Sequence, residues 1–169
     1  MKLVIIFFVV ISVSSSQIAG VENIADRLKV ELAVSSRQVD LKDEVVVTVF
    51  FRSPKKVATI WNALGWNAST GLSLQVLDRF GHPVKEFVQM YDVLPPDETG
   101  KKALISIGGD VFAGFDSHIP AKLLFPGPGR YTLKCVYSPP LSRNYFRGTM
   151  IWGKEDGTIE SPGVAVSVK

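Results

Sequence analysis

The side chains that bind transition metals most readily are few in this sequence. They are His82, His118, Cys135, Met90 and Met150, apart from the initiating methionine. A transition-metal site usually needs three or four such ligands that converge, and no two of the His and Cys residues are spaced by two or four positions. We therefore predict no metal site and no cofactor.

The residues that could serve in covalent or acid–base catalysis also lack a recognisable arrangement. No Gly-x-Ser-x-Gly sequence is present, and the two-residue alternation of residues 131–137 turns the thiol of Cys135 inward, away from any histidine base. The glycine-rich segment 108–114 lacks the Lys-Ser/Thr ending of a phosphate-binding loop. No spacing singles out a pair among the sixteen carboxylates. We predict that the protein is not an enzyme.

Aromatic and arginine side chains gather in two segments without strand alternation, residues 61–70 and 139–152. Exposed Trp, Tyr and Arg concentrate binding energy, because they bury large areas at a small loss of entropy. If both segments lie at one end of the fold, they form a recognition surface for a protein or a glycan. Alternatively, Trp61 and Trp66 are core residues that close the open ends of the sheets. The candidate binding residues are Trp61, Trp66, Arg143, Tyr145, Phe146, Arg147 and Trp152.

Asn67 begins the sequence Asn67-Ala68-Ser69, which is an acceptor for N-linked glycosylation if the source is eukaryotic. An occupied Asn67 would place the neighbourhood of Trp66 at the surface.

The elements that must position these side chains follow the two-residue period of half-buried strands. Residues 45–51 are too uniformly apolar for an edge and are expected to form a central strand. Short helical turns are expected at 18–28 and 111–118. The expected strands are residues 28–34, 45–51, 72–77, 84–90, 103–107, 119–125, 130–137, 150–153 and 163–168. This spacing predicts an all-β, two-layer antiparallel sandwich of about seven to nine strands, with a single domain over residues 28–169.

The run Pro128-Gly129-Arg130-Tyr131-Thr132-Leu133 resembles the Gly-x-Tyr-x-Cys stretch of immunoglobulin-like domains. There a tyrosine at a tight corner folds its phenol back onto a backbone group, and Tyr131 takes that structural role here. Leu133 stands where those domains have cysteine, so the resemblance extends to bridge-free sandwiches such as fibronectin type III modules. It implies an immunoglobulin-like fold with a recognition or scaffold function.

The order of strand runs, hairpin and a late Pro-Gly-x-Tyr strand is also similar to the proteinase-inhibitor domain called BsuPI. That likeness implies an extracellular protease inhibitor as the alternative function.

Composition and the first residues indicate where the protein acts. The formal net charge of the 169 residues is only +3, which argues against a nucleic-acid partner. Residues 1–16 have the order of a secretory signal peptide, with cleavage after Ser16 or as late as Gly20. The apolar run from Leu3 to Val13 is shorter than the roughly 20 residues of a spanning helix, so no membrane anchor is expected after cleavage. We predict a secreted or periplasmic protein whose single cysteine, Cys135, is buried and unpaired.

Overall fold

The computed structural model describes residues 28–54, 56–89, 93–109 and 111–169. The predicted signal peptide, its later cleavage point after Gly20 and the helical turn expected before Leu28 lie outside these residues. No helix in the described part of the chain has the length and apolar character needed to cross a membrane.

The first sheet places the most apolar strand in its centre. Its order is β1 (Lys29–Val34), β3 (Glu44–Arg52) and β8 (Ala113–Pro120), and both pairings are antiparallel. Val45, Val47, Val49 and Phe51 of β3 are buried, whereas the residues between them are half-buried on the opposite face. The central position predicted for this strand is confirmed.

The second sheet is built around β9 (Gly129–Tyr137). Its order is β2 (Gln38–Val39), β11 (Val164–Val168), β9, β5 (Leu72–Leu77) and β6 (Pro83–Phe87), and β10 (Ile159–Glu160) also pairs with β9. The pairings are antiparallel except that β2 runs parallel to β11. Leu74, Val76, Leu133 and Cys135 lie on its buried face and pack into one core with the buried residues of the first sheet.

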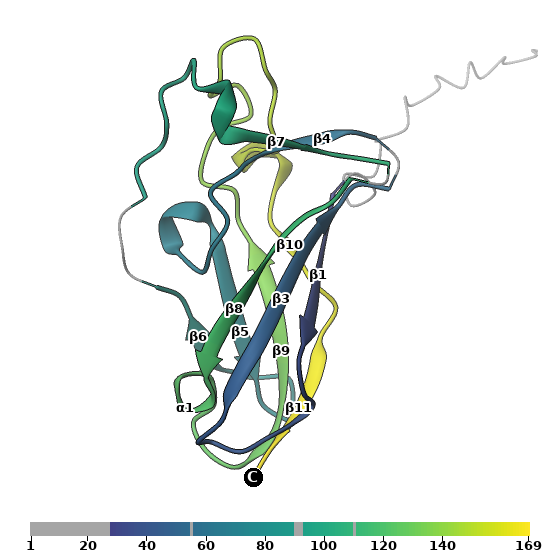
Figure 1. Ribbon diagram of the computed structural model, residues 1–169, viewed down its shortest axis with the longest axis vertical. Coiled ribbons are helices and arrows are strands. Elements are labelled where there is room, and N and C mark those ends of the chain that lie inside the picture. The colour runs from purple at the N-terminus through teal and green to yellow at the C-terminus, as the bar shows by residue number, and fades with distance from the viewer. Residues whose placement is uncertain (1–27, 55, 90–92, 110) are drawn as a thin grey trace, which may run out of the picture.

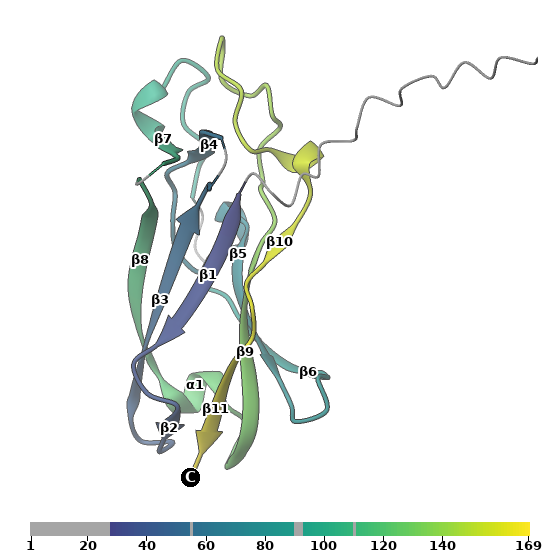
Figure 2. The ribbon, with the colours of Figure 1, turned by 90° about the vertical axis from the view of Figure 1, so that its right-hand side faces the viewer.

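The two sheets form the layers of a sandwich, and a third small sheet lies across one end (Figures 1 and 2). This third sheet pairs β4 (Ala58–Trp61) with β7 (Leu104–Ile107). We call this end of the molecule the β4–β7 end. Helical turns are short: η2 (Ala68–Thr70), η3 (Lys101–Ala103), α1 (Ala121–Leu124) and η4 (Lys154–Asp156). The predicted all-β sandwich is confirmed.

Three local predictions are wrong. Residues 111–118, expected as a helical turn, enter β8, which pairs with β3 from Ala113 onward and in which the exposed Asp116 and His118 alternate with the half-buried Phe115 and Ser117. Residues 119–125, expected as a strand, turn into α1 directly after Pro120. Residues 150–153 form no strand; instead the backbone N–H of Trp152 donates to Thr59 O at 2.7 Å. β4 was not among the strands expected from the sequence, because polar and apolar residues do not alternate along it.

The corner before β9 has the geometry that the immunoglobulin-like resemblance implies. Tyr131 Oη donates to Gly127 O at 3.0 Å, and the ring packs on Phe125 with centroids 5.2 Å apart. Leu133 and Cys135, which follow on the same strand, are fully buried. Tyr131 thus folds back as the resemblance implies, and Leu133 and Cys135 pack in the main core.

Burial makes the Cys135 thiol unreactive. Removal from water raises the pKa of Cys135 to about 12, and the reactive form of a thiol is the thiolate. We expect the native protein to resist a thiol reagent such as Ellman's reagent at pH 8, and the urea-unfolded protein to react fully with one equivalent. Rapid reaction of the native protein, with no loss of structure, would contradict the buried position of Cys135.

Candidate functional site

Four of the predicted binding residues are core residues. Trp61, Trp66, Phe146 and Trp152 are all buried, and only 1% of Trp66 is exposed. The ring of Trp66 meets the ring of Phe115 edge to face, with centroids 5.3 Å apart. The prediction that these four form an exposed recognition surface is wrong, because their rings are enclosed by the sheets and loops around them. The core alternative is confirmed for Trp61 and Trp66.

The two predicted segments nevertheless meet at the β4–β7 end. Trp61 of the first segment packs with Leu141, Phe146 and Ile151 of the second in a small core separate from the main one. Figure 1 shows the chain after β9 rising beside β4 and β7 at this end. Trp61 and Phe146 thus attach the loop of residues 139–152 to the small sheet.

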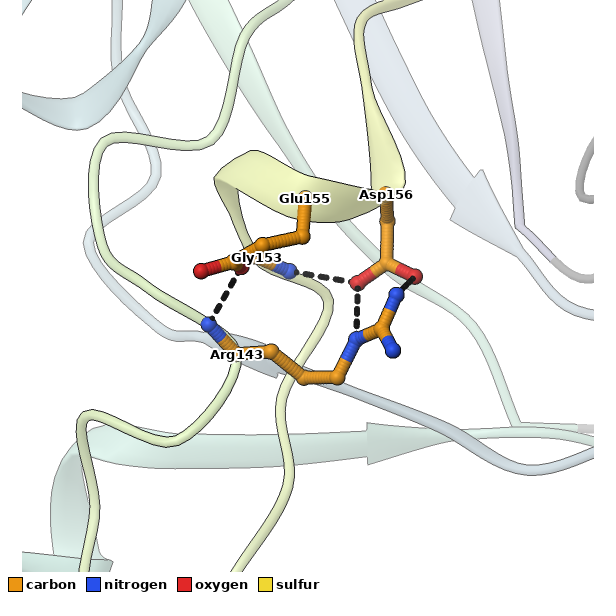
Figure 3. A network of polar contacts seen from close by, with 4 residues as sticks. All are labelled: Arg143, Gly153, Glu155 and Asp156. Atoms are coloured by element: carbon orange, nitrogen blue, oxygen red, sulfur yellow. Dashed lines mark hydrogen bonds and ion pairs between the residues drawn. The ribbon is translucent and has the colours of Figure 1, made fainter.

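Arg143 fixes the same loop to η4 (Figure 3). Its guanidinium contacts Asp156 at two points, from Nη2 to Oδ1 at 2.6 Å and from Nε to Oδ2 at 3.2 Å. Its backbone N–H donates to Glu155 Oε2 at 2.7 Å, and this bond is the main reason that the pKa of Glu155 lies below its usual value. Asp156 Oδ2 also accepts from the backbone N–H of Gly153 at 2.9 Å. These contacts give Arg143 a structural role.

Tyr145 and Arg147 join the loop to the segment before η3. Tyr145 Oη donates to Pro96 O at 2.9 Å, and Arg147 Nε lies 3.2 Å from Glu98 Oε2. Tyr145 is half-buried, whereas Arg147 is exposed. Arg147 is thus the one fully exposed side chain of the predicted set, and it already has an acidic partner.

Asn67 is buried, which contradicts its predicted role as a glycosylation site in the folded protein. Its side-chain Oδ1 accepts from Ser69 N at 2.7 Å and caps the N-terminus of η2. Only 1% of the residue is exposed, so a glycan on its amide has no path to solvent. The local turn uses the same Asn and Ser that make up the glycosylation sequence.

A different surface at the β4–β7 end exposes apolar side chains. Phe112 is 61% exposed and Val111 55% exposed, beside a hollow of about 420 Å³. We call it the Phe112 hollow. Its lining residues are Glu31, Phe50, Arg52, Ser53, Pro54, Gly109, Val111 and Phe112.

The outer face of the first sheet positions the floor of the Phe112 hollow. Phe50 points outward from β3, between Glu31 of β1 and Gly114 of β8. A Cβ on Gly114 would collide with Val49 O and lie 3.2 Å from the Phe50 ring, so a glycine is needed there. Phe112 stands edge to face against Phe50, with ring centroids 5.9 Å apart. The result is an aromatic pair on a sheet face that is open to solvent.

Charged residues form one side of this hollow. Arg52 Nη1 lies 3.3 Å from Glu31 Oε1, and both side chains are largely exposed. Lys29 is not part of the lining but lies next to it, opposite Arg52 in the register of β1 and β3, and it makes no ion pair within the described ranges. Two cations therefore accompany one carboxylate, which favours an acidic group on a ligand that enters the hollow.

The histidine of the first sheet, His118, contacts a carboxylate. His118 Nδ1 lies 2.7 Å from Glu44 Oε1 on the exposed face of the first sheet. Among the residues that the structure describes, no three His, Cys, Asp or Glu side chains are grouped so that they could hold a metal ion.

No family model and no curated protein matches the chain. Solved structures show distant likenesses. The sporulation control protein Spo0M from Bacillus subtilis aligns at a TM-score of 0.44 and 11% identity over 85% of this chain, which spans only 49% of Spo0M. The CARDB domain of the PF1109 protein from Pyrococcus furiosus aligns at a TM-score of 0.36 and 12% identity, over 84% of this chain and 87% of that domain.

Proposed function

We propose that the protein is an exported, non-enzymatic β-sandwich module that binds a protein partner through the Phe112 hollow. The observation that carries the proposal is the exposed ring of Phe112 packed on the half-buried Phe50, beside a hollow that is open to water. Exposed apolar surface of this kind marks interaction sites, and aromatic anchors supply much of the binding energy of protein interfaces. The signal sequence expected at residues 1–16 supports a location outside the cytoplasm.

The chemistry of the hollow favours a peptide segment over a neutral sugar. A sugar needs several hydrogen-bonding groups that converge on its hydroxyls, whereas Phe50, Pro54, Val111 and Phe112 give this hollow an apolar lining. The hydroxyl of Ser53 already donates to the carbonyl of Lys56. The preferred ligand is an aromatic or aliphatic side chain for the hollow, followed or preceded by Asp or Glu for Lys29 and Arg52.

A peptide-display library panned on the purified chain tests this function. Selected peptides should share an apolar residue beside an acidic one, and their affinity should be measured by fluorescence anisotropy. We expect Phe112→Ser to weaken binding at least tenfold, because loss of a central aromatic anchor typically removes more than about 1.4 kcal/mol.

Phe80→Ser is the matched control, because Phe80 is an equally exposed phenylalanine outside the hollow. It should leave peptide affinity unchanged. The proposal fails if Phe112→Ser binds the selected peptides like the unmodified protein, or if neutral glycans on an array occupy the hollow instead. Inhibition of an extracellular protease at micromolar concentration, unaffected by Phe112→Ser, would favour the BsuPI-like alternative.

A further inference from the structure

The end of the sandwich opposite β4 and β7 carries a second hollow of different chemistry. It lies between the turn that joins β5 to β6 and the start of β9, and has a volume of about 590 Å³. Figure 2 shows the β5–β6 hairpin projecting from the body of the molecule near this end. We call it the Arg79–Arg130 hollow. Its lining residues are Asp78, Arg79, Phe80, Gly129, Arg130 and Tyr131.

Both arginines of this hollow are without an acidic partner among the residues that the structure describes. Neither guanidinium lies within ion-pair distance of a carboxylate in the described parts of the chain, whereas Arg52, Arg143 and Arg147 each pair with one. Arg79 lies in the turn between β5 and β6, whereas Arg130 lies in β9, and both are exposed. An anion that enters the hollow can therefore receive hydrogen bonds from two guanidinium groups.

The acidic residue of the hollow, Asp78, accepts hydrogen bonds within its own turn. Asp78 Oδ1 accepts from the backbone N–H groups of Phe80 and His82, at 2.8 and 2.9 Å. Its other oxygen lies 3.5 Å from His82 Nδ1. The hydrogen bond from His82 N is the largest cause that lowers the pKa of Asp78, so the carboxylate stays ionised and holds the turn. Because its lining has two arginines and one carboxylate, the hollow has a net positive charge.

Aromatic rings accompany these charges. Phe80 is 68% exposed, and the guanidinium of Arg79 lies 4.6 Å from the centre of its ring. Tyr131 contributes a half-buried ring whose hydroxyl is fixed on Gly127. An exposed ring beside paired cations suits a ligand that has a flat apolar face and an anionic substituent on the same small unit.

We propose that the Arg79–Arg130 hollow binds an acidic sugar, with the sugar ring against Phe80 and its carboxylate or sulfate between the two arginines. This site is independent of the peptide-binding function assigned to the Phe112 hollow. A nucleic acid would need a longer track of cations than two arginines provide, and the net charge of the chain is only +3. An acidic peptide would satisfy the arginines but has no group that requires the Phe80 ring.

Calorimetric titration of the purified chain with defined probes tests the proposal. The probes are a galacturonate tetramer, a sulfated oligosaccharide, neutral maltotetraose, sodium acetate and sodium sulfate. We expect at least one acidic oligosaccharide to bind, its affinity to fall as salt increases, and the neutral sugar and the simple anions to bind at least tenfold more weakly. Equal affinity for maltotetraose, or for sulfate alone, would overturn the assignment.

Variants locate the site and separate its two parts. Arg79→Gln and Arg130→Gln should each weaken the acidic sugar about tenfold or more, because each removes charge-assisted hydrogen bonds. Phe80→Ser should weaken the sugar without changing the response to sulfate. Arg147→Gln removes the same charge at the opposite end and should have no effect. Unchanged affinity in Arg130→Gln, or tighter binding of oligothymidylate or polyglutamate than of any acidic sugar, would refute the proposal.

Discussion

Replacing Trp66 with alanine is expected to lower the free energy of unfolding by about 3–5 kcal/mol. The residue is 1% exposed, belongs to the main core and meets Phe115 edge to face. Its backbone carbonyl also accepts from Gln89 N at 2.6 Å, which fixes the backbone at this position. Removal of the indole leaves a cavity that these fixed neighbours cannot fill.

Urea unfolding followed by circular dichroism measures this effect. Trp66→Phe should cost less, because the indole Nε1 has no hydrogen-bond partner among the described residues and its loss breaks no bond. Phe112→Ala is the control for an exposed aromatic residue and should change the free energy of unfolding by no more than about 0.5 kcal/mol. A loss below about 1 kcal/mol in Trp66→Ala would restore Trp66 as a surface candidate.

Replacing Gly71 with alanine is expected to destabilise the protein by about 2–5 kcal/mol. Gly71 has a φ of +79°, a conformation that costs other residues about 1–2 kcal/mol. A Cβ at this position would also overlap the carbonyl oxygen of Ser138, and such overpacking typically costs a further 1–3 kcal/mol or so. Ser138 cannot withdraw freely, because its N–H donates to Gly71 O at 2.7 Å.

Gly81→Ala separates the two causes. Gly81 has a similar φ of +85°, but a Cβ there would meet no atom within 4 Å. Thermal unfolding of both variants should therefore show a small loss for Gly81→Ala, from the backbone conformation alone, and a distinctly larger loss for Gly71→Ala. Equal losses in the two variants would mean that the chain at Ser138 moves aside, contrary to the close approach that the structure shows.

The sandwich could be predicted from sequence because its strands carry their burial in a local pattern. In β5 buried residues alternate with the half-buried Ser73 and Gln75, the uniformly apolar β3 suits a central strand, and the turn around Gly81 separates β5 from β6. The elements that were wrongly predicted or missed lack such a pattern. β4 has three buried residues among its four. The helix α1 is a single turn, and its first residue, Ala121, donates its backbone N–H to the backbone carbonyl of Asp43.

The prediction of the binding residues was wrong for a related reason. Whether Trp61 or Phe146 is exposed depends on β7 and on the loop after β9, which are distant in sequence, so residue type alone could not decide it. The outward position of Phe50 follows from the alternation of burial along β3 in the structure, which the uniformly apolar residues 45–51 do not reveal in the sequence. The position of Phe112 could not be predicted from the sequence either. Its segment was expected to be helical, and only the pairing of β8 with β3 brings Phe112 to Phe50.

The central claim is that a protein partner binds at the Phe112 hollow and not at the loop of residues 139–152. Backbone amide chemical shifts, recorded as a peptide selected on the purified chain is added, test this claim most directly. The account predicts that the largest shifts fall on Glu31, Phe50, Arg52, Val111 and Phe112. Shifts concentrated on Arg143, Tyr145 and Arg147, with the hollow unchanged, would contradict it.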